Sequence, residues 1–316
     1  MNTLSKQTVQ QWVVGAEEAG QRVDNYLLRK LKGVPKSHIY RVLRSGEVRV
    51  NSGRVDPTCR LESGDRIRVP PIRLVPRAES TAPKGQTLPV VFEDEALLVV
   101  NKPAGLAVHG GSGVASGVIE QLRQQRPEAR FLELVHRLDR ETSGLLLIAK
   151  KRSALTALHA RLREGGMGKH YLALVQGRFR NRRQQVKLAL YKYLTAEGER
   201  RVRVAEDGQA ALTVFTRRAR WAEASLLEAE LHTGRTHQIR VHLAHLGHPI
   251  AGDDKYGDFT WNRDLAKRGL KRMFLHAARL ALPHPLSGER LQFEAPLPAE
   301  LERFLASLGE GEQDHD

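Results

Sequence analysis

The sequence is poor in cysteine and contains no long apolar run. Cys59 is the one cysteine in 316 residues, so the chain has neither an internal disulfide nor the thiolates of a cysteine-based zinc site. No segment approaches the roughly 18 consecutive apolar residues of a membrane-spanning helix. The first residues also lack the basic stretch, apolar core and small-residue cleavage site of a secretory signal. We therefore expect a cytoplasmic protein without a membrane segment or a cysteine-bound metal.

Positive charge is what the sequence has in excess. It contains 51 Lys/Arg and 36 Asp/Glu residues, its formal net charge is +15 and its pI is about 10.2. Such a charge attracts polyanions, which leaves RNA, DNA and anionic membranes as partner classes. The missing membrane segment makes nucleic acid the leading class. The length also allows two domains, one of them small.

The positive charge is concentrated near the N-terminus. Residues 22–73 contain thirteen Lys/Arg and five Asp/Glu residues. Apolar residues three or four positions apart predict a helix over 22–32 and a second helix capped by Ser37. An ordinary solvated surface would also be rich in charge. Here both helices carry basic residues that we expect to contact RNA: Arg29, Lys30, Lys36, Arg41 and Arg44.

The remainder of this basic region alternates in the manner of short strands. The pattern predicts strands at 48–50 and 67–69, with an Asn-Ser-Gly turn at 51–53. Together with the basic helices and a following Gly-Asp pair, this segment resembles the S4 RNA-binding domain. The resemblance implies a small RNA-binding domain over 20–73, preceded by an N-terminal tail over 1–19.

Prolines mark a boundary after the basic region. Four prolines between residues 70 and 83 predict an extended linker at 74–87. Beyond it, the alternation of apolar runs and turns predicts a strand-rich α+β domain over 88–308. Its strands are expected at 90–92, 97–100, 145–148 and 171–175, and its helices at 153–164, capped by Ser153, and 236–246. The acidic, glycine-containing segment 309–316 is expected to be a disordered tail.

Two polar groups interrupt segments that should be core. Asp139 lies in the loop 136–144, directly before a buried strand, where a rigid element can hold a catalytic group. A surface ion pair with Arg137 or Arg140 is the commoner reason for such a cluster. Arg240 follows a core residue of the second predicted helix and can reach inward toward a carboxylate, although an exposed arginine is the simpler interpretation.

Two further features carry weaker signals. Tyr171 starts a predicted strand, where an aromatic residue is usually part of the core. The three histidines His242, His245 and His248 suggest a metal site, but their spacing places them poorly on one helix face and no cysteine joins them. We expect no metal there, and interpret these histidines as capping, packing or phosphate-binding groups.

Four segments, taken in order, resemble the RluA family of pseudouridine synthases. They are Asn-Lys-Pro-Ala-Gly from 101, His-Arg-Leu-Asp from 136, Lys-His-Tyr-Leu-Ala-Leu from 169 and Gly-Arg-Thr-His-Gln-Ile-Arg-Val-His from 234. The second and fourth are highly specific as a pair, and the match extends over 89–298. The resemblance implies an α+β fold whose mixed, mainly antiparallel sheet forms the catalytic domain. With the S4-like segment, it also indicates a family member that acts on large-subunit rRNA.

The resemblance also assigns roles to four residues. Asp139 corresponds to the catalytic aspartate, and Arg240 to its ionic partner. Arg137 corresponds to the arginine that replaces the flipped base in the RNA stack, and Tyr171 to the tyrosine against the target uracil. A phenol is also a candidate, though weak, base for the C5 proton. The reaction breaks and remakes one glycosidic bond without a change of oxidation state, so we expect no cofactor.

Three alternatives to a monomeric synthase acting on 23S rRNA remain open at this stage. The protein can be a non-enzymatic RNA-binding or ribosome-assembly factor, which would leave Asp139 and Arg240 unexplained. It can be a nucleosidase or glycosidase, with Glu141 as the second acid that such enzymes ordinarily use. A synthase with a tRNA substrate or another rRNA site is the third, because no base-reading residue is evident from the sequence.

Overall fold

The computed structural model describes residues 9–31, 34–72, 87–110 and 116–314. The chain divides into two compact units, Met1–Lys84 and Gly85–Asp316. The expected linker at 74–87 lies outside the described residues except for residue 87, and the division between the units falls inside it. No helix among the described residues is long and apolar enough to cross a membrane.

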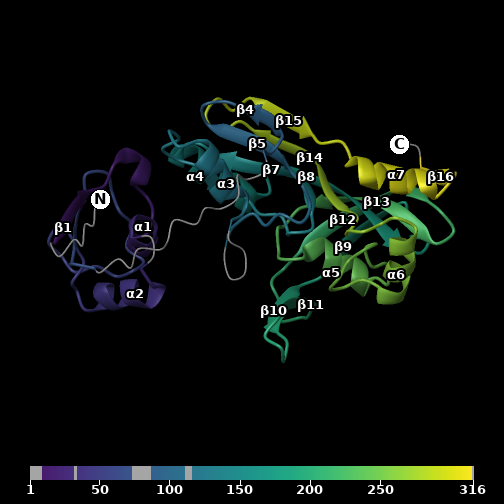
Figure 1. Cartoon of the computed structure of the whole chain (residues 1–316), viewed down its shortest axis with the longest axis horizontal. Coiled ribbons are helices and arrows are strands. Elements are labelled where there is room, and N and C mark those ends of the chain that lie inside the picture. Colours follow the sequence, from purple (N-terminus) through teal and green to yellow (C-terminus); the bar gives the residue numbers. More distant parts are fainter. Residues whose placement is uncertain (1–8, 32–33, 73–86, 111–115, 315–316) are drawn as a thin grey trace, which may run out of the picture. The chain divides into compact units, whose positions relative to one another are not determined.

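The first unit is a three-stranded antiparallel sheet with two helices (Figure 1). Its elements are β1 (Gln10–Val13), a short 3-10 helix (Ala16–Glu18), α1 (Val23–Lys30), α2 (Lys36–Arg44), β2 (Arg49–Val50) and β3 (Arg66–Val69). The apolar faces of α1 and α2 pack on the sheet in one core that includes Val23, Leu27, Ile39, Val42 and Ile67. The predicted helices and strands of this unit are therefore present.

Two expectations for the first unit are wrong. Residues 10–13, expected within a tail, form β1 and pair with β3, because their alternating burial places one face on the core. Ser37 does not cap α2: the helix begins one residue earlier, and Pro35 is the capping residue. The Pro35 carbonyl accepts the first hydrogen bonds, from the amides of His38 and Ile39.

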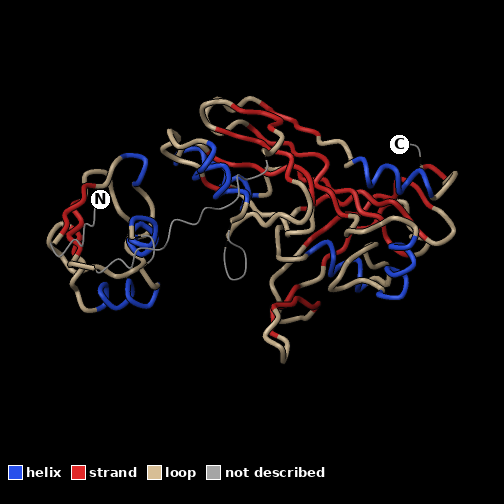
Figure 2. The backbone as a smooth tube through the Cα atoms, in the orientation of Figure 1, coloured by secondary structure: helices blue, strands red, loops and turns tan. Residues whose placement is uncertain are grey.

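The second unit is built on a large mixed sheet (Figure 2). Its main path runs in the order β16-β12-β13-β8-β14-β7-β5-β4, and β15, β6 and β9 pair at its sides. β7 and β14 are parallel, whereas the other pairings of described strands are antiparallel. The predicted mixed, mainly antiparallel sheet is therefore confirmed. The strands are β4 (Val90–Glu93), β5 (Leu97–Lys102), β6 (Glu133–Leu134), β7 (Ser143–Ala149), β8 (Gly168–Gln176), β9 (Arg183–Lys187), β12 (Leu212–Arg220), β13 (Ala224–Leu231), β14 (Leu275–Pro283), β15 (Arg290–Glu294) and β16 (Glu312–Gln313).

Helices pack against this sheet (Figure 2). They are α3 (Val118–Gln125), α4 (Arg152–Glu164), α5 (Gln238–His245), α6 (Phe259–Lys267) and α7 (Ala299–Ser307). β5 and β7 are apolar on both faces because one face packs with α3 and the other with α4. The strands β10 (Leu190–Leu194) and β11 (Arg200–Val204) form a separate hairpin that projects from the unit (Figure 1).

The helix boundaries differ from expectation in two places. α4 begins at Arg152 after Lys151, so Ser153 lies inside the first turn and is not its cap, while Gly165 ends the helix with φ +76° as its sequence position predicts. α5 begins at Gln238, two residues later than expected, because His237 adopts a left-handed conformation with φ +53°.

The described part of the acidic C-terminal segment packs on the sheet, whereas a disordered tail was expected. Its strand β16 pairs with the edge of β12. The Asp314 carboxylate accepts hydrogen bonds from Arg217 Nε at 2.6 Å and Arg217 Nη2 at 2.9 Å. The acidic composition therefore serves a structural purpose, since it neutralises arginines on the neighbouring strand.

Candidate active site

The loop that carries Asp139 is fixed at both of its ends. Leu138 is buried in the core, and the loop leads into β7 through Gly144, whose φ is +110°. A Cβ atom at Gly144 would lie 2.2 Å from the carbonyl oxygen of Ala277 on β14. Only glycine allows this close approach of the two parallel strands. The sheet therefore holds the loop, and the Asp139 carboxylate with it, at one position.

Lys102 at the end of β5 holds the same loop through a hydrogen bond to its backbone. The residue is fully buried, and its Nζ atom donates to the carbonyl oxygens of Pro103 at 2.9 Å, Leu106 at 2.8 Å and Arg140 at 3.0 Å. Burial lowers the pKa of Lys102 to about 7, whereas three carbonyl acceptors match the three donors of an ammonium group and favour it. The Asn-Lys-Pro-Ala-Gly segment thus holds the loop that carries Asp139, a role that its turn residues alone did not reveal.

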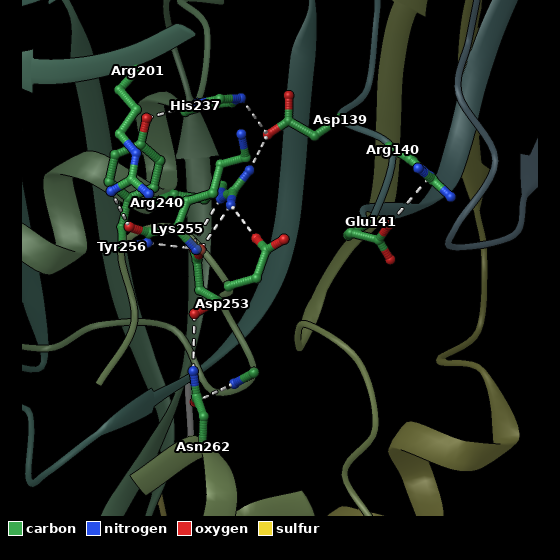
Figure 3. A network of polar contacts seen from close by, with 12 residues as sticks. Asp139, Arg140, Glu141, Arg201, His237, Arg240, Asp253, Lys255, Tyr256 and Asn262 are labelled. Carbon is green, nitrogen blue, oxygen red and sulfur yellow. Dashed lines mark hydrogen bonds and ion pairs between the residues drawn. The ribbon is translucent and has the colours of Figure 1, made fainter. Parts of the chain in front are cut away.

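Arg240 on α5 lies within hydrogen-bonding distance of Asp139, as the sequence predicted. Its Nη1 atom donates to Asp139 Oδ2 at 3.2 Å, and its side chain is 4% exposed against 23% for Asp139 (Figure 3). The stronger partner is Asp253, whose two carboxylate oxygens each lie 2.7 Å from the guanidinium. Asp254 adds a contact at 3.2 Å. Arg240 is therefore held by Asp253 and presented to Asp139.

Asp253 is fully buried and was not predicted from the sequence. Burial disfavours its charge, but Arg240 and the backbone amides of Lys255 and Tyr256 lower the pKa of Asp253 below its ordinary value. For Arg240 burial acts against the cation, while the hydrogen bonds and charge of Asp253 outweigh burial and raise its pKa. Both groups are therefore ionised at neutral pH. The available signal was the acidic pair after the apolar residues 249–251, since a carboxylate beside core residues requires a partner.

His237 lies on the other side of Asp139. Its Nε2 atom is 3.9 Å from Asp139 Oδ2, and its Nδ1 atom is 2.8 Å from the hydroxyl of Tyr256 (Figure 3). That hydroxyl accepts from the amide of Val202 on β11 at 3.0 Å, so its own proton is free for Nδ1. This arrangement favours the tautomer with the proton on Nε2, facing Asp139. Burial lowers the pKa of His237, which keeps the ring neutral.

Tyr171 and Arg137 form the walls of a pocket beside Asp139. The pocket is lined by Arg137, Leu138, Asp139, Thr142, Tyr171, Leu231, Gly234, Arg235, Thr236, His237, Gln238, Ile239, Arg240 and Leu275. Tyr171 is buried, and burial together with the Asp139 charge raises the pKa of its phenol. A phenol that stays protonated is a poor base, so Tyr171 contributes the flat face of its ring to the pocket rather than a proton acceptor. Arg137 is exposed at the rim.

The three histidines after Arg240 do not face a common point. His242 is buried between the Thr213 hydroxyl and the Leu188 carbonyl, whereas His248 contacts the carbonyl of Gln176. Within the described part of the chain, no group of three or more His, Cys, Asp or Glu side chains is arranged to hold a metal ion. His242 and His248 are therefore engaged in hydrogen bonds within the fold.

The basic residues expected to bind RNA in the first unit fall into two groups. Arg29 and Lys30 both pair with Glu18, at 3.0 and 2.8 Å, so their charge is partly used inside the unit. The others lie on α2: the Lys36 ammonium is over the ring of Tyr40, Arg41 contacts His38, and Arg44 donates to the Tyr40 carbonyl. The face of α2 is thus the better candidate for phosphate contact.

Comparison with known proteins agrees with this geometry. Residues 96–245 match the RNA pseudouridylate synthase family, and residues 21–67 match the S4 domain. Ribosomal large subunit pseudouridine synthase C of Pasteurella multocida is 53% identical over 96% of this chain and 95% of its own. The protein of the same name from Escherichia coli strain K12 is 54% identical over 93% of this chain and 95% of its own.

Solved structures show the same likeness. Human RNA Pseudouridylate Synthase Domain Containing 1 aligns with a TM-score of 0.56 and 27% identity, over 73% of this chain and 99% of its own. Human RNA Pseudouridylate Synthase Domain Containing 4 aligns with a TM-score of 0.57 and 27% identity, over 70% and 92% of the two chains. The chain therefore belongs to the RNA pseudouridylate synthase family and combines its catalytic domain with an S4 domain.

Proposed function

We propose that this RNA pseudouridine synthase converts uridines of 23S rRNA in the large ribosomal subunit to pseudouridine, with Asp139 as the catalytic carboxylate. The observation that carries the proposal is the lining of the pocket, in which Asp139 is the one acid among the described residues and lies with Tyr171 and Arg137. The two relatives named for the large ribosomal subunit, each covered almost completely, support the choice of RNA.

The chemistry requires one carboxylate beside the ribose. The C1′–N1 bond breaks, the uracil turns, and C5 bonds to C1′; the C5 proton is lost and N1 gains a proton, so atoms and electrons balance without a cofactor. A carboxylate can start this sequence by attacking C1′ or by removing the 2′ hydrogen. Both routes use the carboxylate oxygens of Asp139, one of which lies 3.2 Å from Arg240 Nη1 and 3.9 Å from His237 Nε2.

Access to the reacting atoms requires the uridine to leave its stack. Flipping a paired base costs a few kcal/mol, and the exposed Arg137 at the pocket rim is placed to fill the vacated position with its planar cation. Tyr171, buried next to Asp139, supplies a flat surface for the detached ring. The pocket residues thus divide into a group that acts on the sugar and a group that holds the base.

Glu141 would be the second acid if the protein were a nucleosidase, but its side chain points away from Asp139. Its side chain turns toward Arg140, with which it pairs at 3.5 Å (Figure 3). The distinguishing experiment incubates the protein with 23S rRNA, maps pseudouridine, and assays free uracil. Isomerisation gives pseudouridine without uracil release. Released uracil, or rRNA with no new pseudouridine, would contradict the proposal.

A further inference from the structure

A second, larger groove adjoins the catalytic pocket. It has a volume of about 570 Å³ and shares Arg137, Tyr171 and Arg235 with that pocket. Among the described residues, no Asp or Glu belongs to its lining, which contains four Arg/Lys and three His residues: Arg137, Arg163, Lys169, Arg235, His109, His136 and His232. A cavity with cationic and neutral walls beside the reaction centre is suited to an anion.

Lys169 is the unusual member of this lining. It lies on β8 two residues before Tyr171, so both side chains project from the same face of the strand, roughly 7 Å apart along it. Lys169 is 7% exposed, yet among the described residues its ammonium has no hydrogen-bonding or ion-pairing partner. Burial alone lowers its pKa. Lys169 is thus a largely buried cation that lines the groove without a counterion among the described residues, and an anion bound in the groove would stabilise its charge.

We propose that this groove binds one backbone phosphate of the RNA next to the target uridine, and that Lys169 is its buried ligand. The inference rests on the proposed function, because it takes Tyr171 as the residue against the uracil. A uridine whose base lies against Tyr171 has its own phosphate and the next one a single nucleotide away. This distance is similar to the spacing of roughly 7 Å between Tyr171 and Lys169 along β8. Arg163 and Arg235, which also line the groove, extend the positive surface around the phosphate.

The protein side of the proposal is tested with Lys169→Met, which keeps the length of the side chain and removes its charge. Lys267→Met is the matched control, since Lys267 lies on α6 with its side chain 78% exposed. For Lys169→Met we expect roughly tenfold weaker binding of a uridine-containing stem-loop. The log-log salt slope should fall by roughly 0.7–0.9, the value of one phosphate contact. The melting temperature should not fall, and Lys267→Met should match wild type.

The RNA side is tested by replacing single phosphates near the target uridine with neutral methylphosphonates. One replacement should weaken binding to the wild-type protein, and the same replacement should add little to the loss already caused by Lys169→Met. Equal penalties in both proteins, or wild-type affinity and slope for Lys169→Met, would overturn the proposal. If Lys169→Met does not fold, Lys169→Gln takes its place, and a wild-type scan without a sensitive phosphate also overturns it.

The outcome is separable from that of the proposed function. Binding and salt slopes are measured without turnover, so they test the phosphate site alone. Pseudouridine formation by the wild-type protein on the unmodified stem-loop tests the function. Lys267→Met, whose residue lies outside both pockets, should form pseudouridine at the wild-type rate in the same assay.

Discussion

Asp253→Asn should uncouple Arg240 from its support while leaving Asp139 in place. The substitution preserves size but removes the charge opposite a guanidinium that is 4% exposed, and it turns an NH₂ group toward the Arg240 donors. Removing one partner of such a buried pair costs about 3–5 kcal/mol of unfolding free energy. Asp254→Asn is the matched control: Asp254 contacts the same arginine at 3.2 Å but is 67% exposed, so its loss should cost below about 1 kcal/mol.

The same variant should slow catalysis. An Arg240 released from Asp253 no longer holds a fixed position against Asp139, and a barrier higher by about 1.4 kcal/mol corresponds to a tenfold slower reaction. We expect single-turnover pseudouridine formation at saturating RNA to fall at least roughly tenfold for Asp253→Asn, with RNA affinity unchanged. Chemical denaturation and the single-turnover rate are the two assays. Equal stability losses for the two variants, or a wild-type rate for Asp253→Asn, would refute the reasoning.

The pH dependence gives a further check on this pair. The folded-state pKa of Asp253 lies below its ordinary value. As the pH falls, Asp253 is therefore protonated in the unfolded chain before it is protonated in the folded protein. The stabilisation is therefore fully present above about pH 4 and is lost as the pH falls through the lower folded pKa. The difference in unfolding free energy between wild type and Asp253→Asn should shrink in this acid range and stay constant from pH 5 to 7.

Three other perturbations have defined outcomes. Tyr171→Phe should retain turnover within about tenfold, because the raised phenol pKa argues against a base role; a complete loss would restore that role. Lys102→Met should remove the hydrogen bonds that hold the Asp139 loop, seen as faster amide exchange at 139–142 and a slower single-turnover rate; unchanged exchange would contradict this role of Lys102. Deletion of residues 1–84 should weaken rRNA binding and flatten its salt dependence while a short stem-loop at saturation is still modified; unaltered rRNA affinity would contradict a capture role.

Local patterns predicted the elements of this fold better than their ends. The apolar periodicities predicted α1, α4 and the central strands correctly because the apolar residues of these elements are buried in the folded protein. The caps assigned to Ser37 and Ser153 were wrong because a neighbouring residue can start a helix equally well. β16 was not predicted because it is held by pairing with β12 and by arginines of that strand, about ninety residues away in sequence. The composition of the segment does not reveal these long-range contacts.

The site shows the same division. Asp139 and Arg240 were recognised from motifs and meet in the structure, although they lie about a hundred residues apart. The supporting groups Asp253 and Lys102 were not assigned, because their importance arises from complete burial and from partners that only the folded chain brings together. Residues that belong to a specific motif are thus easier to recognise in the sequence than the residues that hold them in position.

Single-turnover pseudouridine formation by Asp139→Asn on 23S rRNA tests the central claim most directly. Asn can still accept a hydrogen bond from Arg240, so fold and RNA affinity should match wild type, but it can neither attack C1′ nor act as a base. Glu141→Gln, which alters the neighbouring acid without touching Asp139, serves as the control and should remain active. The account predicts no pseudouridine above background for Asp139→Asn, and turnover near the wild-type rate would contradict it.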